Sequence, residues 1–474
     1  MQRSGFPGLF FYFSCFHHCL LAIIKLQGEH EKVRGVKVGD GSMAIDIKPM
    51  HSYWLALLSV CCLIVFVFVL PQFFISYFQR SSESVDSFDT FKLGLENISQ
   101  DFLRALTQRN NFSYTVALVT NHTGHDQVGN RNVDILIQKG LNIKKIFVPY
   151  DDLDAGSHKS TGQKHIDSVT RIPIFNLLGR QINVEDFKKI DVIFFDLQDV
   201  GIRYSGSLGI LLNVMEVAGR LGKTVVVLDR PNLLGDAIEG AFEPTNLQQS
   251  LLSVSVPIRY GMTIGELAQY CNKYLLKTAA KLFVVPMDHY NRHLYPYKAP
   301  TGKLSPNIHS IESCHGYSFL GLLGEVAPFD IGIGTDKAFQ CILLPHHIAF
   351  SKKQWFNLKE QLKVLGIDSG FYRYYSYRKK EFCRGLRVCI RDIGTFSLFK
   401  ALVATLEFFQ NEGVALKFSD QFSKIPGMYK VKELVKGTRR REDFEAELKY
   451  ELEQFFVMAS SSFIYKPYPK VVLV

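Results

Sequence analysis

The stretch "IFFDLQDVGIRYSG" (residues 193–206) changes from apolar to charged character within a few positions. Its first part, extended by Val192, is the kind of unbroken apolar run that forms a strand covered on both faces. The residues that follow are polar or permit a turn: Asp196, Gln198, Asp199, Gly201 and Arg203. A covered strand that ends in acids, an amide and a guanidinium is typical of a sheet with a binding site at its strand ends.

Four other short apolar runs end in polar or turn residues in the same way: "YTVALVTN" (114–121), "IKKIFVPY" (143–150), "KTVVVLDR" (223–230) and "AKLFVVPM" (280–287). Helical patterns such as 208–221 and 263–276 lie between them. This alternation predicts a parallel sheet with helices on both faces, an α/β Rossmann-like domain. Ligands of such sheets bind beyond the carboxyl ends of the strands, where the polar residues of this chain fall.

The pattern changes after about residue 320. The segment "FYRYYSYRKKEFCRGLRVCIRD" (371–392) predicts strands, whereas 395–409 and 440–456 have the spacing of amphipathic helices. We therefore predict a Rossmann-like domain over residues 92–318, followed by a smaller α+β domain over residues 319–474.

The N-terminal part contains an apolar segment, "YWLALLSVCCLIVFVFVLPQFFISYF" (53–78), with no charged residue. It exceeds the roughly 20 residues that span a bilayer, and lysines and an arginine precede it. The positive-inside rule predicts a cytoplasmic segment (1–52), a single transmembrane helix, a linker (79–91) and a large domain on the outer, periplasmic side of the cytoplasmic membrane. Another apolar stretch (6–26) leaves open a second span, or a true start at Met43.

Composition excludes several other classes of protein. The chain has 474 residues, of which 47% are hydrophobic, so an intrinsically disordered protein is not expected. The net charge of +10 suits an anionic partner, but no basic block interleaved with aromatic residues points to nucleic acid. The nine cysteines show no zinc spacing, and no GxGxxG follows the first strand. We expect neither a metal nor a cofactor.

Carboxylates gather at or near the predicted strand ends: Asp151, Asp152, Asp154, Asp196, Asp199, Asp229, Glu239 and Glu325. An acid at a strand end can simply cap the next helix, and Asp199 can do so for the helix after Gly206. Several acids close to Arg203, Arg230 and Arg259 fit a glycosidase instead. There one carboxyl group protonates the leaving oxygen, while another attacks or activates water. An arginine can hold a substrate carboxylate bidentately.

Several of these elements occur, in the same order, in exo-β-N-acetylmuramidases of the NamZ/YbbC type: "VTNHTG" (119–124), "FFDLQDVGIR" (194–203), "VVLDRPNLLG" (226–235), "IEG" (238–240), "PIRYGMTIGELA" (257–268), "VVPM" (284–287) and "SPN" (305–307). The similarity continues through "GIGT" (332–335), "CRGLRVCIRD" (383–392) and "FIYKPY" (463–468). The chain therefore resembles this family over residues 92–468.

The resemblance implies a Rossmann-like domain, a smaller second domain and an active cleft between them. It also implies removal of the terminal, non-reducing N-acetylmuramic acid from peptidoglycan fragments, a sugar whose lactyl carboxylate suits arginine side chains. The catalytic residues expected on this basis are Asp151, Asp199 and Glu325. The expected substrate-binding residues are Asn121, Gln198, Arg203, Arg230, Asn232, Glu239, Arg259 and Asn307.

The chain departs from the family pattern at several places, among them "YSGS" (204–207) in place of F-Y-T-Y, and Ile331 and Ile333 in place of a glutamate and an arginine. The family usually reads F-x-P-E-H-G-x-R-G, whereas this chain reads "FVPYDDLDAG" (147–156). Tyr150 stands where the family has its glutamate, and Tyr260 replaces the histidine of a later element. We expect Asp151, or its neighbour Asp152, to take over the lost carboxyl function. Two alternatives stay open: a catalytically degenerate member that binds wall sugars or a wall enzyme, and a non-enzymatic envelope scaffold.

Overall fold

The computed structural model describes residues 91–107, 114–149, 164–177, 180–243, 254–292 and 304–473. The predicted membrane helix (53–78) and the predicted catalytic Asp151 lie outside these ranges. Within them, no helix combines the length and the apolar character needed to cross a bilayer.

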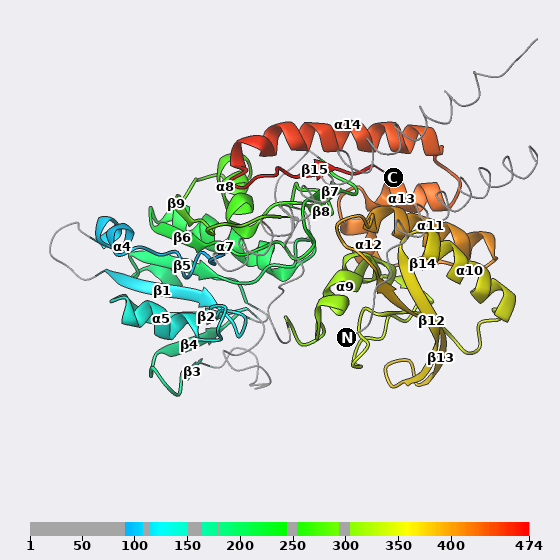
Figure 1. Cartoon of the computed structure of the whole chain (residues 1–474), viewed down its shortest axis with the longest axis horizontal. Helices are drawn as coiled ribbons and strands as arrows, with labels where there is room; N and C mark the ends of the chain where they lie inside the picture. The colour runs from blue at the N-terminus through cyan, green and yellow to red at the C-terminus, as the bar shows by residue number, and fades with distance from the viewer. Residues whose placement is uncertain are drawn as a thin grey trace, which may run out of the picture. The chain divides into compact units, whose positions relative to one another are not determined.

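The first half of the described chain is built on a seven-stranded sheet, ordered β3-β4-β2-β1-β5-β6-β9 (Figure 1). Its strands are β1 (Thr115–Thr120), β2 (Asn142–Val148), β3 (Lys164–Ile166), β4 (Pro173–Asn176), β5 (Val192–Asp196), β6 (Thr224–Leu228) and β9 (Lys281–Val285). The edge strand β3 pairs antiparallel with β4, and all other pairs are parallel. Numbered along the chain, the six parallel strands run 3-2-1-4-5-6, which is the Rossmann order. The predicted parallel α/β sheet is confirmed.

Both faces of the sheet are covered, which explains the apolar strands. Alternate side chains of β1 and β5 pack into two separate cores, because successive residues of a strand point to opposite faces. One core includes helices α7 (Gly206–Arg220) and α8 (Ile264–Tyr274), and the other includes α4 (Gln100–Thr107) and α5 (Asn132–Gln138). A short helix, α6 (Val184–Phe187), leads into β5.

The second half contains an antiparallel sheet, ordered β11-β13-β12, and a set of helices. The sheet consists of β11 (Cys341–Pro345), β12 (Ile367–Ser376) and β13 (Glu381–Ile390). The helices are α9 (Ile311–Leu323), α10 (Lys352–Val364), α11 (Leu398–Asn411), α12 (Asp420–Lys424), α13 (Met428–Val435), α14 (Arg441–Ala459) and the 3-10 turn η3 (Ser460–Ser462). The short strands β10 (Val326–Ala327) and β14 (Lys417–Phe418) pair with each other.

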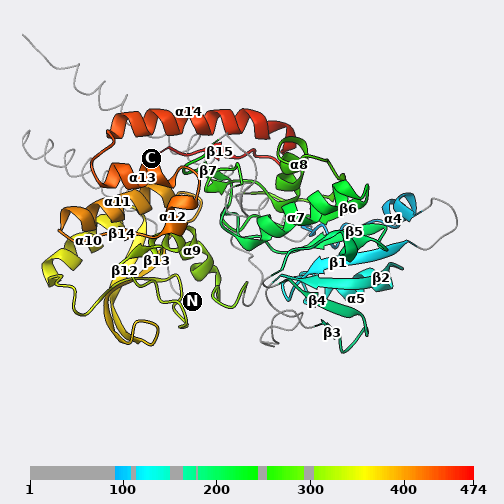
Figure 2. The ribbon, with the colours of Figure 1, turned by 180° about the vertical axis from the view of Figure 1, so that it is seen from behind.

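The two halves share structure across the predicted boundary at residue 318, which falls inside α9. Strand β15 (Lys470–Val471) returns from the C-terminus and pairs with β7 (Ala237–Glu239), which also pairs with β8 (Arg259–Tyr260). Figures 1 and 2 show α14 running alongside both halves.

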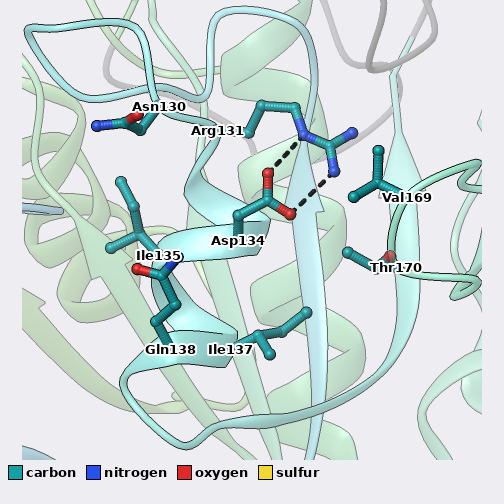
Figure 3. Close-up of a pocket in the computed structure, with 8 residues that line it drawn as sticks. All are labelled: Asn130, Arg131, Asp134, Ile135, Ile137, Gln138, Val169 and Thr170. Carbon is teal, nitrogen blue, oxygen red and sulfur yellow. Dashed lines mark hydrogen bonds and ion pairs between the residues drawn. The ribbon is translucent and has the colours of Figure 1, made fainter.

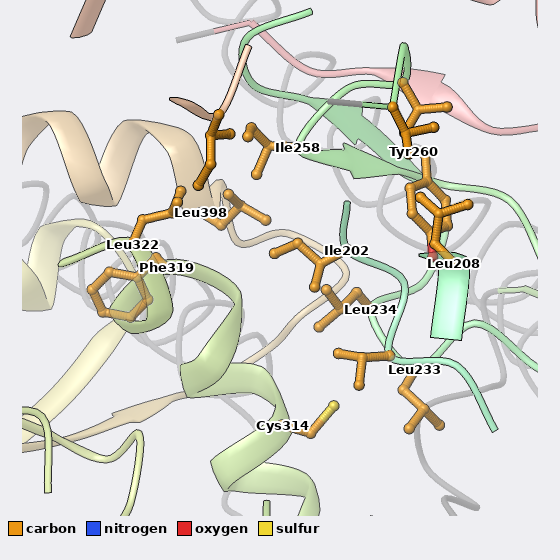
Figure 4. Close-up of a cluster of buried hydrophobic side chains, with 14 of the residues drawn as sticks. Ile202, Leu208, Leu233, Leu234, Ile258, Tyr260, Cys314, Phe319, Leu322 and Leu398 are labelled. Carbon is orange, nitrogen blue, oxygen red and sulfur yellow. The ribbon is translucent and has the colours of Figure 1, made fainter. Parts of the chain in front are cut away.

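A continuous hydrophobic core joins the halves (Figure 4). Ile202 and Leu208 from the first half lie in one cluster with Phe319, Leu322 and Leu398 from the second. Each fully buried side chain of this size contributes about 1.5–3 kcal/mol. The second half is therefore an integral part of the surroundings of the sheet.

Candidate active site

The order of the parallel strands reverses between β1 and β5, so the carboxyl ends of these two strands define the expected ligand crevice. Hydrogen bonds tie together the loops that leave these strands. Thr123 Oγ1 donates to Asn121 Oδ1 (2.6 Å) and accepts from the backbone N–H of Gln198 (3.2 Å). The structure thus brings Asn121 and Gln198, two predicted site residues, to the same end of the sheet.

Gln198 and Asp199 both carry a buried oxygen atom that lacks a hydrogen-bond donor among the described residues, Gln198 Oε1 and Asp199 Oδ1. Their other polar atoms are engaged. Gln198 Nε2 donates to the carbonyl of Pro231 (2.7 Å), and Asp199 Oδ2 accepts from Tyr260 Oη and from the backbone N–H of Gly201 (2.9 Å). Two adjacent acceptors without donors are suited to a ligand that brings hydroxyl or amide protons.

The pKa of Asp199 is raised, because burial disfavours the ionised carboxylate. The hydrogen bond from Tyr260 opposes this effect, since it stabilises the charged form. Ser205 is the N-cap residue of α7, so the interpretation of Asp199 as the cap of this helix is wrong.

Gly201 fulfils the role expected from the sequence. Its φ angle is 100°, and a Cβ atom at this position would lie 2.0 Å from Asn232 Oδ1. The side chain of Asn232 makes two hydrogen bonds to the backbone. Its Oδ1 accepts from the N–H of Leu234 (2.9 Å), and its Nδ2 donates to the carbonyl of Met262 (2.8 Å). The buried amide of Asn232 thus connects loops at the strand ends.

Asp196, the last residue of β5, forms a buried ion pair with Arg230. Arg230 Nε lies 2.5 Å from Asp196 Oδ1, and a second bond of 3.0 Å reaches Oδ2. Asn132 Nδ2 also donates to Asp196 Oδ2 (2.7 Å). A carboxylate held by a guanidinium and an amide is not free to act as a nucleophile, so this pair supports the site rather than reacting in it.

The other predicted arginines bind within the protein. The guanidinium of Arg203 donates to the backbone carbonyls of Ala241 (3.0 Å), Val256 (2.7 Å) and Pro426 (2.7 Å), and burial lowers its pKa. Since Pro426 belongs to the second half, Arg203 links three segments of the fold. Its side chain is only 1% exposed, so it does not face solvent.

Arg259 and Glu239 form a fully buried ion pair (2.9 Å). Glu239 also accepts hydrogen bonds from Ser397 Oγ (2.8 Å) and from the backbone N–H of Leu398 (3.2 Å), at the start of α11. A carboxylate at a helix N-terminus is stabilised by the helix dipole. This pair therefore fastens β7 and β8 to α11.

The structure also brings together residues around the buried carboxylate of Asp229 that the sequence did not connect. Asp229 accepts from Thr263 Oγ1 (2.8 Å), Gly265 N (2.7 Å) and Tyr465 Oη (2.6 Å). Burial, reinforced by repulsion from Glu266, raises the pKa of Asp229 to about 6. The only available signal was that Asp229 and Tyr465 both lie in motifs quoted above, more than 230 positions apart.

Glu325 and Asn307 make no contact with Asp199 that the described residues show. Asp199 is near the start of α9, where Cys314 lies. Burial and the charge of Asp199 together raise the pKa of the Cys314 thiol. Glu325 follows the end of this helix, roughly 13 Å farther along its axis, and accepts from Ser419 Oγ (2.7 Å). Asn307 is exposed in the turn before α9. No described contact joins either residue to the end of β5.

A hollow of about 620 Å³ lies on the outer side of α5 (Figure 3). Its arginine, Arg131, is neutralised by Asp134 (2.9 Å) and Asp167 (2.9 Å), and these hydrogen bonds raise the pKa of Arg131. None of the predicted site residues lines this hollow. Across the described ranges, His, Cys, Asp and Glu side chains form no group of three or more that could hold a metal ion.

Models of a single protein family match most of the chain. The N-terminal domain of the exo-β-N-acetylmuramidase NamZ matches residues 116–312, and the C-terminal domain of NamZ matches residues 315–465. The peptidoglycan β-N-acetylmuramidase NamZ of Bacillus subtilis is 26% identical over 387 residues, which cover 78% of this chain and 91% of that relative.

Two crystal structures of DUF1343 family proteins from Bacteroides fragilis have the same fold. The first has a TM-score of 0.67 and 26% identity, and the second has a TM-score of 0.59 and 22% identity. Each alignment covers 80% of this chain and 99% of the other chain.

Proposed function

Since the chain belongs to the NamZ family of exo-β-N-acetylmuramidases, we propose that it removes the terminal N-acetylmuramic acid from peptidoglycan fragments. One observation carries this proposal. Gln198 Oε1 and Asp199 Oδ1 are buried oxygen atoms without a hydrogen-bond donor among the described residues, and they follow β5, where the strand order of the sheet reverses. The hydroxyl groups and the acetamido N–H of the sugar can donate to Gln198 Oε1, and the glycosidic oxygen can accept a proton from Asp199 Oδ1 when this carboxyl group is protonated.

In the proposed mechanism Asp199 serves as the proton donor to the glycosidic oxygen. Leaving-group protonation at near-neutral pH needs a carboxyl group with a raised pKa, and burial has this effect on Asp199. Asn121 and Gln198 would orient the sugar. The second carboxyl group that glycosidases require is proposed to be Asp151, whereas Glu325 is less suited because it sits at the far end of α9.

A specific observation favours the alternative of a family member that binds muramic sugars without cleaving them. Asp196 and Glu239, two of the buried carboxylates, are neutralised internally by Arg230 and Arg259. Together with Tyr150 in the place of the family glutamate, this pairing reduces the number of carboxylates free for chemistry.

The deciding experiment incubates the full chain with N-acetylmuramyl-β-1,4-N-acetylglucosamine and measures free N-acetylmuramic acid. We expect release of the sugar, with the isomeric disaccharide that ends in N-acetylglucosamine as the control that is not cleaved. Calorimetric binding of the muramyl disaccharide without release would establish the binding-only alternative. Absence of both binding and release would refute the function.

We further propose that residues 53–78 anchor the protein in the cytoplasmic membrane, with the large domain outside. The uncharged segment and the lysines before it motivate this topology. We expect an alkaline phosphatase fused after residue 90 to be active and a β-galactosidase fused at the same point to be inactive. The reverse result would contradict the proposed orientation.

A further inference from the structure

The hairpin of β12 and β13 presents two arginines directly opposite each other, Arg373 and Arg384. Like charges at opposite positions of an antiparallel pair repel each other. Neither guanidinium has a carboxylate or carbonyl partner among the described residues, in contrast to Arg131, which two aspartates neutralise. The fold thus maintains an unneutralised pair of cations on one face of a rigid sheet.

Aromatic rings flank this pair of arginines. Tyr375 and Phe382 are the next opposed pair along the same face, and their ring centroids are 5.3 Å apart. Phe371 lies two residues before Arg373, hence on the same face. Phe371 and Phe382 are 62% and 58% exposed, which is unusual for phenylalanine and indicates a contact surface.

The surface is hollowed rather than flat. Arg373 and Arg384 line two hollows, of about 630 and 770 Å³. Lys352 contributes to the first hollow and Lys380 to the second. The one carboxylate that lines them, Glu381, is bound to His347 Nδ1 (2.7 Å), so the charge of the surface is strongly positive.

We propose that this face, called the hairpin face (Phe371, Arg373, Tyr375, Lys380, Phe382 and Arg384), binds an intact anionic glycan strand of the cell wall. Guanidinium groups bind carboxylates bidentately, and aromatic rings bury the apolar faces of sugar rings. A polymer that alternates sugar rings with carboxylates matches both features. The choice of a wall glycan rests on the proposed function, but the hairpin face belongs to the second half of the fold and shares no residue with the proposed catalytic site.

On this proposal, the site at the end of β5 and the hairpin face have different roles. The site at the end of β5 would act on a chain end, whereas the hairpin face would hold the same or a neighbouring strand along its length. Binding at a second, linked surface raises the local concentration of chain ends at the site. A carboxylate bound between Arg373 and Arg384 would relieve the repulsion between these two side chains.

The test is co-sedimentation of the full chain, in mild detergent, with purified peptidoglycan sacculi. An excess of muramyl disaccharide occupies the site at β5 during the assay. We expect Arg373→Gln/Arg384→Gln and Tyr375→Ala/Phe382→Ala each to weaken binding about tenfold or more. Disaccharide turnover and the melting temperature should not fall, because Arg373, Tyr375 and Phe382 are exposed, Arg384 is half-buried, and the arginine pair is repulsive.

Arg440→Gln/Lys449→Gln, at the N-cap of α14 and within the helix, is the matched control; it removes the same charge elsewhere and should bind normally. Amidation of the carboxyl groups of the sacculi should weaken binding of the wild type to the level of the arginine variant. The proposal is overturned if the hairpin variants sediment like the wild type. It is also overturned if they lose binding only to anionic phospholipid vesicles, which would identify a membrane surface. Because turnover of the soluble disaccharide is measured separately, a failure of the proposed function is distinguishable from either result.

Discussion

Replacement of Asp199 by asparagine is expected to lower the kcat for the muramyl disaccharide by about 10²–10⁴-fold, the usual contribution of a general acid. Asparagine retains an oxygen that can accept from Gly201 N and Tyr260 Oη, the two donors that hold Asp199 in place. The fold and the KM should therefore change little. The variant lacks only the proton that Asp199 transfers. Asp199 keeps this proton near neutral pH because burial raises its pKa.

The pH profile distinguishes this role from a structural one. Turnover by the wild type should fall as the pH rises through the pKa of Asp199, because the acid loses its proton. Tyr260→Phe removes a hydrogen bond that lowers this pKa, so the descending limb should move to higher pH. Full activity of Asp199→Asn, or a profile that Tyr260→Phe leaves in place, would show that Asp199 only braces the loop.

Replacement of Arg259 by methionine should destabilise the protein by about 3–5 kcal/mol, as measured by urea unfolding followed by circular dichroism. The substitution leaves Glu239 charged and buried without its cation. It also removes the donor to the backbone carbonyls of Phe396 and Ile393, each 3.0 Å away. A loss of this size is a large part of the stability of an ordinary domain.

A second substitution tests the cause of this loss. Glu239→Gln in the Arg259→Met background removes the unpaired buried negative charge of Glu239. The double variant should therefore be more stable than Arg259→Met alone. Arg391→Met breaks an exposed ion pair with Asp368 and should cost at most about 1 kcal/mol. Equal losses for Arg259→Met and Arg391→Met would contradict the proposed importance of the buried pair.

The sheet and its strand ends followed directly from local patterns. The apolar runs at 114–121, 143–150, 191–197, 223–230 and 280–287 all became parallel strands. The short strands β3 and β4 were not predicted, because segments of three and four residues carry little periodicity. The hairpin at 371–392 and the helices near 395–409 and 440–456 were also recognisable, within a few residues at their ends.

The roles of individual charged residues were harder to predict. Arg203, Arg230 and Arg259 were expected to face a substrate carboxylate, but each binds carbonyls or carboxylates of the protein itself. A sequence records that an arginine follows a strand, not which atoms lie around its guanidinium. Those atoms come from segments such as Pro426 and Phe396, more than 130 positions away.

Sequence alone was sufficient for the α/β class and the family, since strand periodicity, turn residues and ordered motifs are local properties of the chain; the site at the strand ends stays a prediction. Only the folded chain distinguished the donor-free oxygens of Gln198 and Asp199 from the neutralised carboxylates of Asp196 and Glu239. Only the cross-strand register placed Arg373 opposite Arg384. Burial and pairing depend on residues distant in sequence, and these two properties set the charge and the reactivity of a side chain.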